Sequence, residues 1–171
     1  MLRRVDAAYA VPLSEALRAS IPELRDFMDW AQDDPSDEGA IGQFLEICDR
    51  DWIADRAYNF HVFLADTDTL VGSCGLMRRV GPGAIEIGYW VRSDHAGRGY
   101  ATEAAAILAE AAWGLDGIER IVIRHDLANV GSGRVAEKLG FEEVDKVAVE
   151  VTAEGESGVD VIRERFRPEP L

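Results

Sequence analysis

The chain has 171 residues, of which 32 are Asp or Glu and 18 are Lys or Arg, so its formal net charge is −14. A charge of this sign argues against a protein that wraps nucleic acid or lies on an anionic membrane surface, and it favours a cationic partner. The length predicts one domain, residues 1–171, with enough core to fold without disulfides or metal ions.

Targeting and redox features are lacking in the sequence. No apolar run is long enough to span a bilayer, and the start MLRRVDAAYA does not contain the apolar core of a secretory signal. We therefore expect a cytoplasmic protein. Cys48 and Cys74 form no CxxC pair, and this spacing favours packed, reduced thiols over a metal or redox site.

The first third of the chain has helical patterns. Residues 12–30 contain two short helical patterns. We place the boundary between them at Pro22, because proline is tolerated in a first helical turn but not in a helix interior. Residues 31–39 are acidic and contain Pro and Gly, which predicts a loop. From Ala40 to about Ala57, apolar residues recur at helical spacing and should form one inward face: Ile41, Phe44, Leu45, Cys48, Trp52 and Ile53.

The middle of the chain changes to the patterns of strands. Residues 60–65, 70–79 and 84–91 are rich in β-branched and aromatic residues, and turn sequences at 66–68 and 81–83 separate them. This arrangement predicts an antiparallel meander of three strands.

A helix and a further strand follow the meander. Residues 101–115 are predicted to form a helix whose inward face is mostly alanine, so that it can lie close to a sheet. Residues 120–125, RIVIRH, read as a buried strand. Because strand, helix and strand form a crossover unit, this strand should lie parallel to the strand at 84–91.

The C-terminal part begins with NVGSGRVAEKLGF, residues 129–141, in which Asn129 can cap a short helix that Gly140 ends. Ser132 shares a face of this helix with apolar residues, so it should point into the structure, where a polar group needs a partner. Residues 142–151 and 159–166 predict a final hairpin before a Pro-containing tail.

The stretch from Ile85 to Ala104, IEIGYWVRSDHAGRGYATEA, combines a buried strand, a glycine-rich turn and a helix start. Backbone N–H groups of such a turn can point at one place, and the helix N-terminus adds its own donors and its positive dipole end. The pattern suits a phosphate or pyrophosphate. Taken alone, Gly-x-Gly between a strand and a helix is also an ordinary connection.

Two motifs carry a resemblance to a known family: EIGYWV followed by GRGYATEA, and Asn-x-x-Ser-x-x-Val-Ala-Glu-Lys-Leu-Gly-Phe. Over roughly residues 13–166 the chain resembles the GNAT superfamily of acetyl-CoA-dependent N-acetyltransferases. Within it, the chain looks most like the RimJ/RimL-type ribosomal-protein N-terminal (alanine) acetyltransferases. The resemblance implies an α/β (α+β) domain in which about four to five helices flank a mixed, mostly antiparallel sheet of about six to seven strands, splayed between its two parallel strands.

The resemblance also implies where acetyl-CoA, the co-substrate, binds. The backbone of the turn would hold its pyrophosphate, and the pantetheine arm would lie between the splayed strands, beside Asn129 and Ser132. No metal is implied. The residues assigned to acetyl-CoA are Trp90, Val91, Arg92, Gly97, Arg98, Gly99, Tyr100, Ala101, Thr102, Asn129 and Ser132.

Two residues are the predicted catalytic groups. Glu86 occupies the position of the glutamate base of several superfamily members, and the alternative is that it only orders water or binds a cationic substrate. Many members have a tyrosine acid where this chain has Ala136, which leaves Ser132, or a water molecule, to protonate the departing thiolate. A second departure is Ala96, where the superfamily usually has Gln or Arg, and this predicts weaker contacts with the nucleotide end of acetyl-CoA.

The acceptor side has no motif. Trp30, Tyr58 and His125 are weak candidates for substrate binding. The alternative for Trp30 and Tyr58 is a place in the core, and a histidine at such a position is more often structural.

We expect acetyl transfer to a primary amine, and the resemblance implies that this amine is the α-amine of a protein N-terminus. A small cationic amine, such as a polyamine or an aminoglycoside, and a catalytically silent CoA-binding module are the alternatives. Binding to nucleic acid or to membranes is not expected, and a homodimer is compatible with the resemblance.

Overall fold

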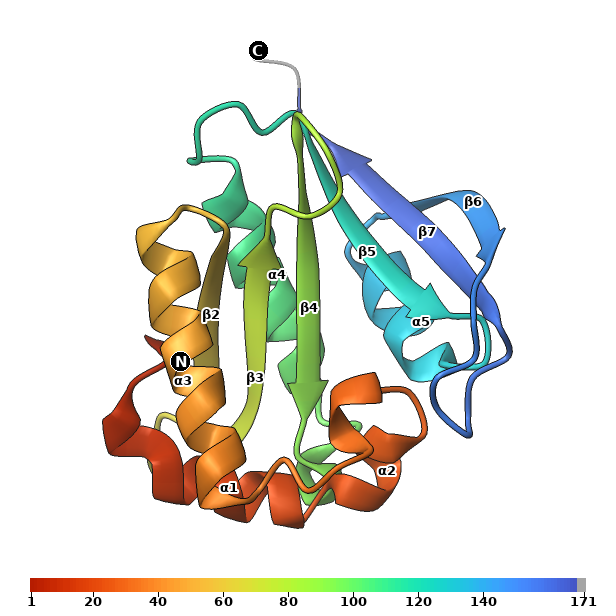
Figure 1. The fold of residues 1–171 in the computed structure, drawn as a ribbon. Coiled ribbons are helices and arrows are strands. Elements are labelled where there is room, and N and C mark those ends of the chain that lie inside the picture. Colours follow the sequence, from red (N-terminus) through yellow and green to blue (C-terminus); the bar gives the residue numbers. More distant parts are fainter. Residues whose placement is uncertain (169–171) are drawn as a thin grey trace.

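The computed structural model describes residues 1–168, so the end of the predicted Pro-containing tail lies outside the described residues. A single seven-stranded sheet, in the order β1-β2-β3-β4-β5-β7-β6, forms the middle layer (Figure 1). Helices α1, α2 and α3 lie on one face of the sheet, and α4 and α5 lie on the other. The predicted α/β fold with a mixed sheet is confirmed.

The strands are β1 (Leu2–Arg4), β2 (Ala57–Phe63), β3 (Leu70–Met77), β4 (Ala84–Val91), β5 (Arg120–Asp126), β6 (Glu142–Ala148) and β7 (Val159–Phe166). The α-helices are α1 (Ala10–Arg18), α2 (Ile21–Arg25), α3 (Glu38–Ile53), α4 (Tyr100–Ala112) and α5 (Val130–Lys138). Short 3-10 turns are η1 (Ala7–Tyr9), η2 (Asp29–Ala31) and η3 (Ser93–His95). Among the described residues, no helix has the length and apolar character needed to cross a bilayer.

The helix starts follow from local chemistry. The Asp37 side chain accepts hydrogen bonds from the backbone N–H groups of Gly39 and Ala40, which caps α3. Asn129 caps α5 in the predicted way, accepting a hydrogen bond from the Ser132 N–H at 3.1 Å. Pro22 lies in the first turn of α2, where its missing N–H costs nothing.

The β4–β5 pair is parallel, as predicted, but short. Its ladder joins only Ala84 with Arg120, Ile85 with Ile121, and Glu86 with Val122. Beyond Glu86 the two strands diverge, toward the lower edge of the sheet in Figure 1. Residues 87–91 of β4 therefore have no partner strand on their β5 side.

The core has one cluster on each face of the sheet. On the α4 side, the small residues Ala104, Ala105, Ala109 and Ala112 are at most 2% exposed and let the helix lie directly on the strands. The other cluster joins α1, α2 and α3 to β2 and β3. Both faces of the middle strands are thus buried, which is why their sequences are almost continuously apolar.

Two sequence expectations were wrong in detail. Ile53 is 83% exposed and Phe44 is 37% exposed, so the inward face of α3 is narrower than its periodicity indicated. Ile53 is the last residue of the helix. Strand β1 was not predicted, because three residues are too short to show an alternating pattern.

The two cysteines are buried free thiols. Burial raises the pKa of Cys48 and that of Cys74 to about 12. A thiol of such a pKa stays protonated near neutral pH and is a weak nucleophile.

Candidate active site

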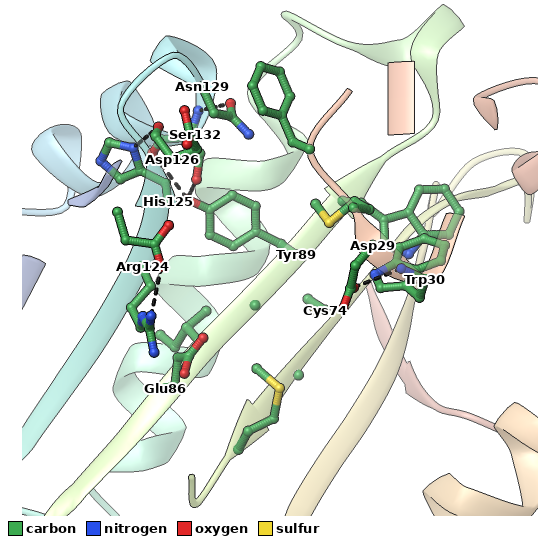
Figure 2. A pocket seen from close by; sticks show the side chains of 18 of the residues that line it. Asp29, Trp30, Cys74, Glu86, Tyr89, Arg124, His125, Asp126, Asn129 and Ser132 are labelled. Carbon is green, nitrogen blue, oxygen red and sulfur yellow. Dashed lines mark hydrogen bonds and ion pairs between the residues drawn. The ribbon is translucent and has the colours of Figure 1, made fainter. Parts of the chain in front are cut away.

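A cavity of about 710 Å³ lies where β4 and β5 separate (Figure 2). Its walls come from η2, α3, the strands β3 to β5, the start of α5 and the loop between β6 and β7. Six residues predicted from the sequence line it: Trp30, Glu86, Trp90, His125, Asn129 and Ser132. Among residues 1–168, no group of three or more His, Cys, Asp or Glu side chains is placed to hold a metal ion.

The glycine-rich turn precedes α4. Gly97 and Gly99 have φ angles of 75° and 91°, a region that side chains rarely adopt, and Gly99 is the N-cap of the helix. A Cβ atom added at either glycine would have no neighbour within 4 Å. None of the backbone N–H groups of residues 97–102 has a hydrogen-bond partner within residues 1–168. Six backbone donors without a partner at a helix N-terminus are an arrangement that can bind an anion.

The free edge of β4 connects this turn with the cavity. Trp90 lines the cavity, whereas Val91 and Arg92 lie beyond its walls. The backbone N–H of Arg92 donates to the carbonyl oxygen of Val71 at 2.8 Å, so it is already used within the sheet. Any backbone contact with a ligand would therefore come from residues 87–91, where the ladder with β5 has ended.

Ser132 lies beside a residue that the sequence analysis did not assign. The hydroxyl oxygen of Tyr89 is 3.0 Å from Ser132 Oγ, and Tyr89 also donates to the Ser132 carbonyl oxygen at 3.2 Å. Burial raises the pKa of Tyr89 to about 12, so the phenol keeps its proton at neutral pH. The alternation of β4 was a usable signal: Tyr89 is three residues after Glu86 and so faces the opposite side of the strand.

Glu86 is buried, at 4% exposure, and it is not free. Arg79 donates two hydrogen bonds to it, from Nε to Oε2 at 2.9 Å and from Nη2 to Oε1 at 2.6 Å. This pairing raises the pKa of Arg79 above its ordinary value. Arg79 follows β3 in a loop, and no motif pointed to it.

The cavity lining has an aromatic part and an acidic part. Trp30 is 44% exposed, and its ring centroid lies 6.4 Å from that of Trp90. Two guanidinium groups, those of Arg79 and Arg124, face six carboxylates in the lining. These are Asp29, Glu86, Asp126, Glu150, Glu156 and Asp160. The excess of carboxylates favours a cationic ligand.

His125 lines the cavity, but both of its ring nitrogens are engaged. Nε2 accepts a hydrogen bond from Arg163 Nε at 3.2 Å, so the proton is on Nδ1, which donates to the Asp126 carbonyl oxygen at 2.9 Å. Gly133 of α5 packs against the ring, since an added Cβ would lie 3.0 Å from His125 Cε1. These contacts indicate a structural role.

Asp126 joins the end of β5 to the loop before β7. Burial alone would raise its pKa, but hydrogen bonds from Ser157 and the N–H of Ala128 hold that pKa below its ordinary value. The carboxylate therefore fixes the wall of the cavity in its ionised form.

Tyr58 is not among the residues that line the cavity. Its hydroxyl donates to Asp55, and its ring packs edge-on against Trp52 with centroids 5.1 Å apart. The structure therefore does not bring Tyr58 together with the other candidates.

Comparison with known proteins agrees with this geometry. The family model "Acetyltransferase (GNAT) domain" matches residues 1–142. A Bacillus subtilis (strain 168) protein, "Probable N-acetyltransferase YjcK", is 36% identical over 90 residues, which are 51% of this chain and 49% of that protein. The chain thus spans about half the length of the curated relatives it matches.

Solved structures share the fold. A ribosomal-protein-S5-alanine acetyltransferase from Vibrio fischeri superposes with a TM-score of 0.86 at 16% identity, over 98% of this chain and 93% of that one. RimL, a ribosomal L7/L12 alpha-N-protein acetyltransferase in complex with coenzyme A, also gives 0.86, at 20% identity over 96% and 92%. Identities this low show the common architecture only. Because the family model covers most of the sequence, the chain belongs to the GNAT family of acetyltransferases.

Proposed function

We propose that residues 1–171 form one N-acetyltransferase domain that transfers the acetyl group of acetyl-CoA to a primary amine, most specifically the α-amine of a protein N-terminus. The observation that carries this proposal is the open edge of β4, which lies between two unlike sites. The strand leads from the buried carboxylate of Glu86 in the cavity lining toward a turn with six unpaired backbone donors.

In this proposal the backbone of residues 97–102 binds the pyrophosphate of acetyl-CoA, with the Thr102 hydroxyl beside it. Arg98, Tyr100 and Ala101 contribute through their main-chain N–H groups. The pantetheine arm follows the open edge of β4 past Trp90 and reaches Asn129 and Ser132. Acetyl-CoA supplies the thioester whose carbonyl carbon is attacked.

The chemistry requires two proton movements. Glu86 takes a proton from the acceptor's ammonium, directly or through water, and the free amine then attacks the thioester carbonyl. As the carbon–sulfur bond breaks, the thiolate receives a proton from the Ser132 hydroxyl or from water. Tyr89, hydrogen-bonded to Ser132, orients that hydroxyl and can replace its proton.

The acceptor is proposed from two observations. The acidic lining suits any ammonium group, and the aromatic surface around Trp30 and Trp90 can pack against the side chain of a peptide. The V. fischeri protein and RimL are both described as acetylating ribosomal proteins, which agrees with a protein acceptor. A small cationic amine remains the second candidate, because the same carboxylates would bind it.

Two experiments test the proposal. Calorimetry with acetyl-CoA should show binding at micromolar concentrations, and its absence would overturn the proposal. A thiol-release assay with peptides bearing free N-termini, with aminoglycosides and with polyamines should then give turnover with the peptides. Turnover with only small amines would select the second candidate, and binding without turnover on any acceptor would indicate a silent CoA-binding module.

A further inference from the structure

Arg79 is hydrogen-bonded to the carboxylate of Glu86, the proposed base of the reaction. The Glu86 side chain is 5% exposed, whereas the Arg79 side chain that is bonded to both of its oxygens is 64% exposed. A ligand entering the cavity therefore meets a guanidinium group before it meets Glu86. Both carboxylate oxygens already accept a charge-assisted hydrogen bond from Arg79, which competes with any cation that approaches Glu86.

The floor of the cavity leads to this pair. On adjacent strands β3 and β4, Ser73 pairs with Trp90, Gly75 with Gly88, and Met77 with Glu86. A Cβ at Gly88 would lie 2.8 Å from Met77 Cε, and one at Gly75 would lie 2.6 Å from Asn59 Oδ1. The two glycines therefore leave room for the Met77 and Asn59 side chains to lie against the strands between Trp90 and Glu86. Arg79, two residues after Met77, bonds to Glu86 at this end of the strand pair.

We propose that Arg79 is a specificity residue. Its guanidinium group occupies the position beside Glu86 that the acceptor's ammonium group takes during the reaction, and only another cation displaces it. This inference rests on the proposed acetyl transfer. Leaving a buried carboxylate unpaired is costly, so an incoming ammonium can replace Arg79 where water cannot. Because the Arg79 side chain is largely exposed, its guanidinium moves into solvent without a large packing loss.

The exchange would protect the thioester. If Glu86 were free without an acceptor, it could take a proton from water as that water attacked the acetyl carbonyl carbon. The carbon–sulfur bond would break, the thiolate would take a proton, and acetate and CoA would result. With Arg79 in place, Glu86 is unavailable for this reaction until an amine arrives.

The first test measures thiol release from acetyl-CoA without any acceptor. Arg79→Ala should hydrolyse acetyl-CoA at least about tenfold faster than the unmodified protein, because Glu86 becomes available as a base. The double variant Arg79→Ala/Glu86→Gln should return to the low rate. Arg78→Ala is the matched control, since the neighbouring Arg78 pairs with Asp55 at 3.4 Å and does not line the cavity. An unchanged or lower rate in Arg79→Ala overturns the inference.

The second test needs no acetyl-CoA. An NMR titration with n-butylammonium chloride should show about tenfold tighter binding to Arg79→Ala than to the unmodified protein, and the double variant should lose that gain. Equal or weaker binding to Arg79→Ala would mean that Arg79 orients Glu86 and does not compete with the amine. If acetyl-CoA does not bind at all in calorimetry, the proposed function fails, whereas this titration still decides the role of Arg79.

Discussion

The two halves of the proposed active site are built in different ways. The half proposed to bind acetyl-CoA, residues 97–102 with the start of α5, consists mainly of backbone donors and caps set by residues adjacent in the sequence. The acceptor half consists of side chains from η2, the loop after β3, β4 and the loop before β7. The conformation of the first half is determined by short sequence motifs, whereas the residues of the second half come together only when the sheet has formed.

This difference has a physical origin. A phosphate site made of N–H groups needs a particular backbone conformation, and glycine at fixed positions specifies that conformation. A site for an ammonium group needs carboxylates, but these can come from any positions in the sequence if the fold brings them together. Asp29, Glu86 and Asp160 line one cavity although they are far apart in the sequence.

The largest effect should come from the acceptor half. Glu86→Gln keeps the size of the side chain but removes the proposed base, so turnover should fall by about 10³-fold with acetyl-CoA affinity unchanged. Thiol-release kinetics and calorimetry measure the two quantities. Glu164→Gln is the matched control, because Glu164 is also buried and pairs with Arg120, but lies outside the cavity. Turnover that Glu86→Gln leaves intact removes Glu86 from the mechanism.

The next prediction concerns the sheet that joins the two halves and the dependence of its stability on pH. His61 is fully buried, its Nδ1 lies 2.8 Å from Ser73 Oγ, and burial lowers its pKa from 6.5 to about 4. Between these values the unfolded chain binds a proton that the folded protein does not, so the free energy of unfolding should drop by about 3 kcal/mol as pH falls from 6.5 to 4.

Denaturant unfolding at both ends of this pH range checks that expectation. His61→Phe, which cannot titrate, should show a correspondingly smaller loss. An identical pH dependence in the two proteins would contradict the assignment to His61.

A glycine substitution that changes the backbone of the turn tests the half proposed to bind acetyl-CoA. Gly99→Val places a β-branched residue at a φ of 91°, which should distort the turn and weaken acetyl-CoA binding by about 100-fold. Gly81→Val is matched in strain, since Gly81 has a φ of 95° and open space around it, but lies in the turn before β4. Both variants should lose similar stability in thermal unfolding, and only Gly99→Val should lose affinity. Equal affinities in calorimetry would mean that the turn is only a connection.

The smallest expected effect is a change in kcat when Tyr89, which contacts Ser132 at the start of α5, is substituted. Tyr89→Phe should lower kcat by about tenfold without changing the KM for acetyl-CoA, since only the hydroxyl beside Ser132 is lost. Adding Ser132→Ala should cause little further loss, because the two hydroxyls act as one unit. Multiplicative losses would show that they act separately. Tyr9→Phe, a change beside Phe63 on the other side of the sheet core, serves as control.

Sequence reasoning succeeded where a single segment determines its own structure. The strand, turn and helix from Ile85 onward and the cap at Asn129 were predicted because their signals are adjacent residues. The buried side of α3 was overestimated at Phe44 and Ile53, since periodicity gives the direction of a face but not how far the sheet beneath it extends.

The acceptor side was only partly predictable for the same reason. Arg79 has no motif, and its bond to Glu86 depends on the path of the loop between β3 and β4. Tyr89 could have been placed on the opposite face of β4, but its contact with Ser132 also requires the position of α5. Tyr58 was proposed from its residue type, and its position outside the cavity lining depends on the packing of β2 against α3, which no local pattern gives.

The early end of the β4–β5 ladder makes the sheet incomplete in its own interior. A strand edge exposed at a protein's surface invites pairing with other chains, whereas this one opens only into the protein's own cavity. A bound molecule with amide groups of its own would complete the ladder as a substitute strand. Folding stability would then increase with the concentration of that molecule, and the supply of acetyl-CoA would influence how long each copy of the protein survives as well as how fast it works.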